Sequence, residues 1–338
     1  MAKTILMTGG GTGGHLAIIK AVKEELRDEN LIYIGSTNGQ DRAWFEDDSD
    51  FSKRLFLETK GVTNQSFLGK FRSLANIAKA TKIALSTIKS QKVDVVFSVG
   101  GYSAAPSSFA SKLASTPLVI HEQNAVSGTL NRLLKPYSCN FISSFEEDSL
   151  PYPIKRVFFE KARVRKEVKT VIFLGGSQGA VAINELAISV AKDLNQMGIK
   201  IIHQAGERNI QKVQKEYEKL NIEAEVFGFT QKIPEYMQKA DFAVARAGAS
   251  TLWELSANGL PTLFIPYPYA HLDHQYYNAK FLVDKGLAWV KRQNEVKKSD
   301  ILEILSKDIE PVSKGLIEFT PKDGSKKIAE EILECTRG

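Results

Sequence analysis

The sequence is poor in cysteine, with only Cys139 and Cys335 among its 338 residues. They lie far apart and form no Cys-x-x-Cys or Cys/His pattern, so the sequence offers no cysteine-based metal site. A chain of this length can bury large cores without disulfide or metal support, and a reducing cytoplasm is the simplest environment for it.

Long hydrophobic runs are missing as well. No uninterrupted apolar segment approaches the roughly 18 residues that a transmembrane helix needs. The apolar stretch at residues 4–7 is also too short for a signal peptide. We therefore expect a soluble protein, which can still lie on a membrane surface.

Acidic residues are absent from residues 67–92, although this segment carries six basic ones. The whole chain has 45 basic and 39 acidic residues, so both signs are equally frequent outside the segment. Such a segment suits nucleic acid, phosphorylated ligands or an anionic membrane, and charge alone does not choose among them. The six cations are Lys70, Arg72, Lys79, Lys82, Lys89 and Lys92.

Short apolar runs alternate with amphipathic stretches along the chain, which is typical of an α/β fold with parallel sheets. Strands are expected at residues 4–7, 31–34, 54–57, 93–97, 118–120 and 140–142, and helices at 15–27, 74–90 and 104–114. After a basic stretch at 155–170, interpreted as a linker, a second series of strands is expected at 170–174, 200–203, 224–227, 242–245 and 262–265. Two strand–glycine loop–helix openings, half a chain apart, predict two Rossmann-like domains facing a cleft.

The first glycine loop, residues 9–15, follows the first expected strand and opens a helix. Glycines allow positive φ, and the helix amino terminus offers free N–H groups to an anion. The loop also satisfies the dinucleotide fingerprint, but no acidic residue ends the second strand before Asp41, which weakens a nicotinamide hypothesis. His15, in the first helical turn, is a candidate general base because a helix amino terminus disfavours imidazolium.

Polar clusters follow other strands at the edge where open α/β sheets bind ligands. A second glycine turn holds Gly100, Gly101 and Tyr102, and the next strand is followed by residues 121–124, including Glu122 and Asn124. A third glycine loop surrounds Ser177 and Gln178 and repeats the anion-binding pattern in the second half.

Two further segments of the second half suit a nucleotide sugar. Residues 246–254 supply small side chains and free N–H groups, followed by Glu254 one turn into a helix. Residues 266–278 group several side chains suited to hydroxyl recognition. His271 and His274 have the spacing of a zinc pair but lack a third ligand, and Asp48-Ser49-Asp50 matches the short DxD pattern only within a loop expected to be solvated.

In their order along the chain, these segments resemble the MurG family of bacterial glycosyltransferases. The match spans nearly the whole chain, and each glycine loop alone would be weak. The matching segments are residues 10–15, 100–102, 121–124, 175–180, 248–254 and 273–278.

The resemblance implies a GT-B fold and inverting transfer of N-acetylglucosamine from UDP-N-acetylglucosamine to the muramyl 4-hydroxyl of undecaprenyl-diphosphate-linked muramyl-pentapeptide (lipid I), forming lipid II for peptidoglycan. It implies an acceptor domain at residues 1–155, onto which a last helix at about 318–338 packs back, and a donor domain at 156–317. No cofactor and no metal is implied. The basic segment then points to an anionic membrane surface rather than nucleic acid, and to a peripheral position on the cytoplasmic face of the inner membrane.

The resemblance also implies roles for individual residues. His15 is the first choice as base and Glu122 the second, while Gly100, Gly101 and Tyr102 would bind the acceptor. The family's Asn-Pro-Val-Arg junction is replaced here, so either Lys155 or Arg156 can supply the cation near the donor diphosphate. The residues assigned to the donor are Thr12, Gly13, Gly14, Asn124, Arg156, Ser177, Gln178, Thr230, Ala249, Ser250, Thr251, Glu254, His274, Gln275 and Asn278.

Two other classes stay open at this point. A nucleotide-sugar epimerase of similar fold would bind a UDP-sugar without needing a lipid acceptor. A nucleic-acid-binding protein could use the basic segment, although the sequence has no helix-turn-helix, zinc-finger or RNP signature.

Overall fold

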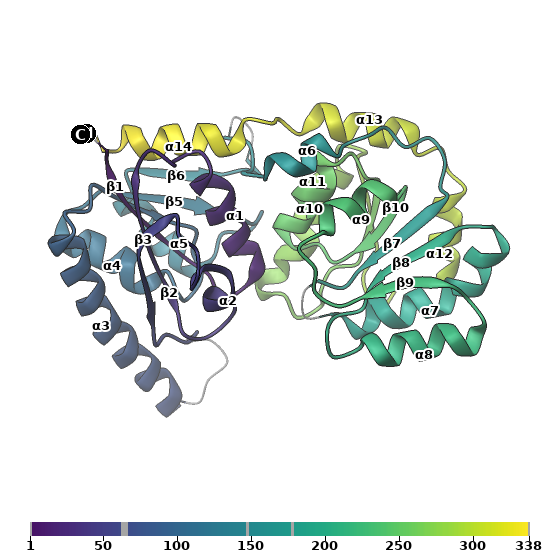
Figure 1. Ribbon diagram of the computed structural model, residues 1–338, viewed down its shortest axis with the longest axis horizontal. Coiled ribbons are helices and arrows are strands. Elements are labelled where there is room, and N and C mark those ends of the chain that lie inside the picture. The colour runs from purple at the N-terminus through teal and green to yellow at the C-terminus, as the bar shows by residue number, and fades with distance from the viewer. Residues whose placement is uncertain (1, 62–66, 147–148, 177–178, 337–338) are drawn as a thin grey trace. The chain divides into compact units, whose positions relative to one another are not determined.

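The structure is a computed structural model of the chain and describes all residues except 1, 62–66, 147–148, 177–178 and 337–338. The side chains of residues 67, 68, 70 and 71 also lie outside the description. The chain divides into two compact units (Figure 1). The first comprises Met1–Lys155 with Asp323–Gly338, and the second comprises Arg156–Lys322.

The amino-terminal unit is built on a parallel sheet in which the described strands have the order β3-β2-β1-β4-β5-β6. Its strands are nearly continuous apolar runs, as expected for a sheet covered on both faces. They are β1 (Thr4–Thr8), β2 (Asn30–Ser36), β3 (Phe51–Leu57), β4 (Val95–Ser98), β5 (Leu118–Glu122) and β6 (Asn140–Ser143).

Helices cover both faces of this first sheet. Leu6, Ile32 and Ile120 pack with α3, α4 and α5 on one face. Because side chains alternate along a strand, Met7 and His121 point to the other face, where α1 lies against α14. The helices are α1 (Gly13–Lys23), α2 (Asp41–Phe45), α3 (Phe67–Ser90), α4 (Ala105–Ala114), α5 (Thr129–Leu134), the 3-10 turn η1 (Lys135–Tyr137) and α14 (Gly324–Glu334).

The carboxyl-terminal unit repeats the arrangement, with the described strands in the order β12-β11-β10-β7-β8-β9 and all pairs parallel. Its strands are β7 (Thr170–Leu174), β8 (Lys200–Gln204), β9 (Ala224–Phe227), β10 (Phe242–Ala245), β11 (Thr262–Phe264) and β12 (Trp289–Val290). Its helices are α6 (Arg156–Glu160), α7 (Val181–Gln196), α8 (Ile210–Leu220), α9 (Ile233–Lys239), α10 (Ala249–Ala257), η2 (His271–Asp273), α11 (His274–Val283), α12 (Lys298–Leu305) and α13 (Glu310–Phe319).

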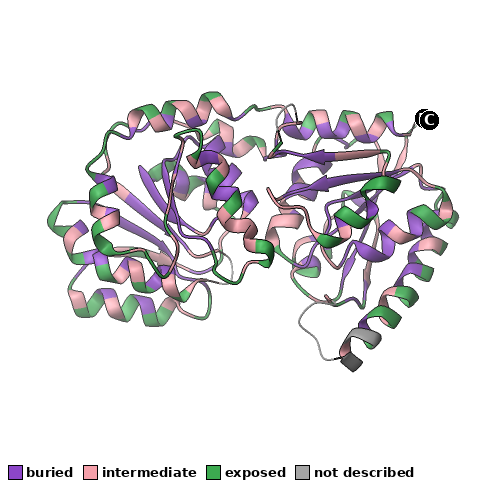
Figure 2. Ribbon diagram, turned by 180° about the vertical axis from the view of Figure 1, so that it is seen from behind, coloured by how far each residue is buried: buried purple, intermediate pink, exposed green. Residues whose placement is uncertain are grey.

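Both sheets therefore have the strand order of a Rossmann fold, with the connection reversing between β1 and β4 and between β7 and β10. The predicted α/β fold class with two Rossmann-like halves is confirmed. Figure 2 shows the buried strands of each sheet and the helices whose outer faces are exposed. Among the described residues, no helix combines the length and the hydropathy that crossing a bilayer would require.

The two cysteines, for which the sequence suggested no partner, form a disulfide between Cys139 and Cys335. Cys139 directly precedes β6, and Cys335 follows the last turn of α14. Spacing along the chain could not indicate this pair, because 196 residues separate the two positions. They meet because α14 packs on the amino-terminal unit, where Asn140 also donates to the Glu331 carboxylate.

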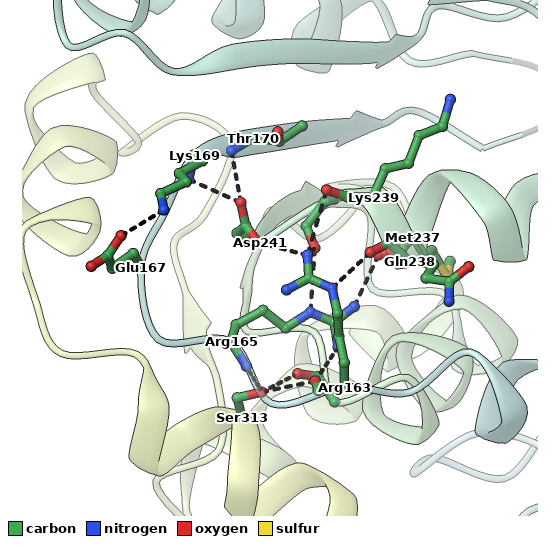
Figure 3. A network of polar contacts seen from close by, with 12 residues as sticks. Arg163, Arg165, Glu167, Lys169, Thr170, Met237, Gln238, Lys239, Asp241 and Ser313 are labelled. Atoms are coloured by element: carbon green, nitrogen blue, oxygen red, sulfur yellow. Dashed lines mark hydrogen bonds and ion pairs between the residues drawn. The ribbon is translucent and has the colours of Figure 1, made fainter.

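Residues 156–169 belong to the carboxyl-terminal unit and are anchored in it by a buried side chain, unlike the expected linker, although several of their other side chains are exposed. Arg165 is fully buried, and its guanidinium donates only to uncharged oxygens (Figure 3). The acceptors are the carbonyls of Arg163, Met237, Ala240 and Asn258 and the side-chain oxygen of Asn258. One cation therefore joins this segment to the carboxyl-terminal ends of α9 and α10.

Candidate functional site

In the amino-terminal unit, the loops after β1, β4 and β5 meet at the carboxyl edge of the sheet. Gly9 and Gly11 have φ values of +129° and +82°, a region that favours glycine. A Cβ atom on Gly101 would lie 3.1 Å from the Gly10 carbonyl oxygen and 3.4 Å from His15 Nε2. The first and second glycine turns and His15 are thus in direct contact.

His15 lies in the first turn of α1, with polar atoms beside both ring nitrogens. Nδ1 is 2.9 Å from Thr12 Oγ1, and Nε2 is 2.9 Å from the amide nitrogen of Gln123. That amide nitrogen can only donate, and it also lies 3.3 Å from Nδ1, so the shorter contact favours the lone pair at Nε2 and the ring proton at Nδ1. A neutral imidazole with an acceptor at Nε2 is the form that a general base needs.

Gln123 is a site residue that the sequence argument missed. It is 8% exposed and lies between Glu122 and Asn124, both of which were singled out. Its contact with His15 joins residues 108 positions apart, so the only available signal was its place within the polar cluster.

Glu122 is buried, and both of its carboxylate oxygens accept hydrogen bonds inside its own loop. Oε1 accepts from the Asn124 N–H at 3.0 Å, and Oε2 accepts from the Gly128 N–H and the Asn131 amide at 2.9 Å each. The Asn131 amide in turn lies under Gly100, where a Cβ would come within 2.8 Å of its nitrogen. These bonds favour a role in shaping the loop over the proton-accepting role considered from the sequence.

Tyr102 packs its ring against Gly11 and donates from its hydroxyl to the Asn38 carbonyl at 3.1 Å. Burial raises the pKa of the Tyr102 hydroxyl, and the nearby Asp41 carboxylate adds to this shift. The phenol therefore remains protonated and acts here as a donor. The sequence-predicted acceptor residues Gly100, Gly101 and Tyr102 thus adjoin the loop that carries His15.

His121 lies behind this edge and is fully buried, with its ring 5.5 Å from that of Tyr152 in an edge-to-face contact. Within the described part of the chain, neither of its ring nitrogens has a hydrogen-bond partner. Burial lowers the pKa of His121 to about 3, with a smaller contribution from His15. The ring is therefore neutral and belongs to the apolar face of the sheet.

The DxD-like pair does not form an open acidic site. The buried ammonium of Lys23 contacts Asp48 at 2.6 Å and Asp50 at 2.7 Å. The two carboxylates thereby pair with the last residue of α1. Over the residues that the structure describes, no group of three or more His, Cys, Asp or Glu side chains could hold a metal ion.

In the carboxyl-terminal unit, Gly248 ends the loop after β10 and caps the amino terminus of α10. Asn278 is fully buried and donates from its side chain to the Ala247 carbonyl at 3.1 Å, which fixes this loop. Ala249 and Ser250 are buried at the helix start, while Thr251 and Glu254 are partly exposed. The helix amino terminus and Glu254 thus lie on the same short segment, as the sequence predicted.

His274 and Gln275 begin α11 after a strained turn. Leu272 and Asp273 both have positive φ, at 53° and 54°, which is unusual for residues other than glycine. Arg292 contacts the Asp273 carboxylate at 2.7 Å and therefore supports this turn. Sequence reasoning missed Arg292, because no motif marks it.

The bonds within this turn decide which atoms remain to bind a ligand. His274 Nδ1 lies 2.8 Å from the His271 carbonyl oxygen, to which it donates, so in the neutral tautomer that this bond selects the acceptor is Nε2. Gln275 accepts the Tyr267 N–H at 2.9 Å through its side-chain oxygen, which leaves its amide N–H groups as donors.

The loop at Phe229 and Thr230 is held by Glu207, another residue that the sequence argument missed. Its carboxylate accepts the Phe229 N–H at 2.7 Å, and a Cβ on Gly228 would press on the same carboxylate. Thr230 Oγ1 accepts the Lys232 N–H at 3.0 Å. The Phe229 side chain, 48% exposed, stands out from this loop.

Three further predicted donor residues, Ser177, Gln178 and Arg156, lie near the start of the carboxyl-terminal unit in sequence. Ser177 and Gln178 lie outside the described residues, between Gly176 and Gly179, whose φ values are +81° and +76°. Arg156 is exposed at the start of α6.

Known proteins and families match this chain over almost its whole length. Residues 5–141 match the glycosyltransferase family 28 N-terminal domain, and residues 170–332 match the family's C-terminal domain. The chain is 61% identical over 329 residues to the "UDP-N-acetylglucosamine--N-acetylmuramyl-(pentapeptide) pyrophosphoryl-undecaprenol N-acetylglucosamine transferase" of Sulfurovum sp. (strain NBC37-1), covering 97% of each chain. It is 50% identical over 333 residues to the protein of the same name from Campylobacter jejuni subsp. jejuni serotype O:6, covering 98% of this chain and 97% of the relative.

Solved structures agree with this. Acinetobacter baumannii MurG superposes with a TM-score of 0.80 at 26% identity, covering 98% of this chain and 99% of that one. The UDP-GlcNAc 2-epimerase of Neisseria meningitidis superposes at 0.66 with 14% identity, covering 99% of this chain and 100% of that one, a likeness of fold alone. Because both family domains and relatives of 50–61% identity cover nearly all of it, the chain belongs to the MurG family within glycosyltransferase family 28.

Proposed function

We propose that this chain transfers N-acetylglucosamine from UDP-N-acetylglucosamine to the muramyl 4-hydroxyl of lipid I, which forms lipid II. The observation that carries the proposal is the 61% identity over 97% of the chain to a relative named for this transfer. The polar edge of the amino-terminal sheet, where three loops surround His15, supplies the chemistry of such a site.

In the proposed reaction, the muramyl 4-hydroxyl oxygen attacks the anomeric carbon of the donor sugar while the bond from that carbon to UDP breaks. Nε2 of His15 accepts the hydroxyl proton, and UDP leaves as an anion. Because the oxygen attacks the face opposite to UDP, the configuration at the anomeric carbon inverts. The Gln123 amide, 2.9 Å from Nε2, keeps the lone pair at that atom until the acceptor hydroxyl takes its place. Glu122 has a supporting role, because it holds the loop that carries Gln123.

The carboxyl-terminal unit would bind the donor. The amino terminus of α10, with its positive dipole end and its backbone N–H groups, suits the diphosphate, and Glu254 suits the ribose hydroxyls. His274 Nε2 and the Gln275 amide supply one acceptor and two donors for sugar hydroxyls. Helix amino termini and a cation from Lys155 or Arg156 would stabilise the charge that develops on UDP, and the mechanism needs no cofactor.

We also propose that the amino-terminal unit lies on an anionic membrane at the cytoplasmic face, where its lipid-linked acceptor resides. The described cations of α3 lie along one exposed face of the helix, and Leu74 and Ile83, 53% and 41% exposed, lie at the edges of that face. Leu113, Leu133 and Tyr137 on the neighbouring α4, α5 and η1 are also exposed, and Lys112 lies over the Tyr137 ring. Exposed apolar side chains interleaved with cations are typical of an interfacial surface.

An assay of UDP release with and without a soluble lipid I analogue tests the activity. A transferase should release UDP only when the acceptor is present, with formation of the disaccharide product. Epimerisation of UDP-N-acetylglucosamine without acceptor, or acceptor-independent UDP release, would contradict the proposal.

A further inference from the structure

Asp41, the first residue of α2, is a buried carboxylate to which the proposed mechanism gives no role. It is 0% exposed, and its hydrogen-bond donors within the described residues are all neutral: the Gly11 N–H at 2.7 Å, the Ser36 N–H at 2.9 Å and the Tyr33 hydroxyl at 3.0 Å. Burial raises the pKa of Asp41, while the bonds from Ser36 and Gly11 oppose that shift. Since an unpaired buried charge is costly, its position calls for a specific reason.

The first glycine loop is built around this carboxylate. A Cβ atom on Gly10 would collide with the Asp41 side chain, and one on Gly35 would lie 2.6 Å from Asp41 Oδ1. The Tyr33 hydroxyl lies 2.9 Å from the Gly9 carbonyl oxygen as well as beside Asp41. Asp41 and Tyr33 therefore hold the loop at Gly9 and at Gly11, the two positions with positive φ.

The constraint on Gly11 reaches His15 through one residue. Thr12 follows Gly11 directly, and its hydroxyl oxygen lies 2.9 Å from His15 Nδ1. On the other side, the ring of Tyr102 packs against Gly11, so the turn is fixed from two directions. The Gly11 N–H is already bonded to Asp41 and is thus withdrawn from any anion that binds this loop.

We propose that Asp41 is a positioning residue for the transfer reaction, because it fixes the Gly9–Gly11 turn and thereby the orientation of His15. The inference rests on the proposed function for its catalytic consequence. Its structural part, that Asp41 controls the His15 ring, can be measured without turnover.

Asp41→Asn is the sharpest test because it removes one bond selectively. Oδ1 accepts from the Ser36 N–H and lies 3.0 Å from the Tyr33 hydroxyl, whose single proton it shares with the Gly9 carbonyl oxygen. Among the described residues, Oδ2 accepts only from Gly11. An asparagine that keeps its oxygen at the first position presents its NH₂ group to the Gly11 N–H, two donors that repel each other. We expect kcat to fall on the order of 10- to 100-fold, because small displacements of a catalytic group have effects of this size. The KM for UDP-N-acetylglucosamine should stay within about twofold of the wild type, since the proposed donor-binding residues of the other unit are untouched.

Asp48→Asn is the matched control. Asp48 is also a mostly buried carboxylate of this unit, but it pairs with Lys23 at the opposite end of α1 from His15. This variant should lose stability without losing kcat.

Tyr33→Phe is a second variant in case Asp41→Asn does not fold, since it keeps the aromatic packing against Phe45 and removes only the hydroxyl. Like Asp41→Asn, Tyr33→Phe should lower kcat.

Ring resonances of His15 supply a readout independent of turnover. The chain has five histidines, so a sample with labelled histidine gives a simple spectrum. Asp41→Asn or Tyr33→Phe should shift the His15 signals, and Asp48→Asn should leave them in place. Unchanged His15 signals in both loop variants would overturn the proposal, as would a kcat equal to that of Asp48→Asn. An inactive wild-type chain would contradict the proposed function instead, and the spectra would still decide the role of Asp41.

Discussion

At the scale of single residues, the histidines of this chain show how burial separates chemical from structural roles. His15 is partly exposed and has polar atoms beside both ring nitrogens, whereas His121 and His203 are fully buried. Burial lowers the pKa of each buried ring to about 3. The contacts and the exposure of His15 together therefore suit a proton-accepting role.

Replacing His15 by alanine tests this role. We expect kcat to fall by about 10²- to 10⁴-fold, the usual contribution of a general base, with UDP affinity unchanged. Steady-state kinetics with a lipid I analogue and calorimetric titration with UDP measure the two quantities. His271→Ala, which removes an exposed histidine side chain, is the control. Near-normal turnover in His15→Ala would show that another group takes the proton.

Arg165 gives a prediction about stability. Arg165→Met keeps the apolar volume but removes the donor to the Met237 carbonyl and to both oxygens of Asn258, whereas the Ala240 and Arg163 carbonyls keep other donors. We therefore expect a loss on the order of 3 kcal/mol of unfolding free energy. Lys166→Met, in the same segment but with its side chain 72% exposed, should change stability by less than about 0.5 kcal/mol. Urea unfolding compares the two variants. Equal midpoints would mean that the guanidinium network adds little to the stability of this unit.

The contacts of residues such as Arg165 and Asp41 could not be predicted from the sequence. A run of basic residues is usually solvated, and one acidic residue after a strand has many explanations. Apart from the Arg163 carbonyl, the acceptors of Arg165 lie 72–93 positions away, and Gly11 lies 30 positions from Asp41, so no local pattern reveals these contacts. The glycines and His15 could be found because strand, loop and helix follow one another directly in the chain.

At the scale of elements, periodicity located the strands well. In the described part of the first half, each expected strand overlaps an observed one, since a parallel strand buried on both faces is a short, continuous apolar run. The segment at 155–170 was predicted to be a linker, because its packing depends on hydrogen-bond acceptors that are far away in the sequence. The long helix α3 was anticipated from residue 74 onward, and its exposed face retains the cations that first drew attention to it.

Helix α3 carries the prediction for membrane binding. Vesicle co-sedimentation should rise with the fraction of anionic lipid and fall with salt, because the described cations form one exposed face. Replacing Lys79 and Lys82 by alanine should weaken binding at low salt by about 2 kcal/mol, or roughly 30-fold, at about 1 kcal/mol for each cation. The matched control replaces Lys212 and Lys215 on α8, which are also exposed. Binding that ignores lipid charge and salt would contradict the proposed surface.

At the scale of the whole molecule, the same strand order occurs twice, and each half has its ligand-binding candidates beyond the carboxyl ends of its strands. The sequence showed this repetition because both glycine openings have similar local patterns. It could not show that Cys139 and Cys335 form a pair. In the reducing cytoplasm proposed for this enzyme, both would be thiols, and contacts such as that between Asn140 and Glu331 would then hold α14.

Each half also contains one buried neutral histidine, which makes the whole molecule sensitive to acid. In the unfolded chain a histidine takes up a proton below about pH 6.5, whereas His121 and His203 in the folded chain do so only near pH 3. Stability is therefore complete above pH 6.5 and is lost as the pH falls toward 3. At pH 5 the loss should be about 2 kcal/mol for each histidine.

His203 is bonded to the Tyr217 hydroxyl and the Asn184 side-chain oxygen, so His203→Gln preserves a polar group there while removing the titration. Urea unfolding at pH 7.5 and pH 5 should show that His203→Gln loses less stability on acidification than the wild type. His271→Gln, at an exposed position, should behave as the wild type does, and an equal loss in all three proteins would exclude His203 as a source of the acid sensitivity.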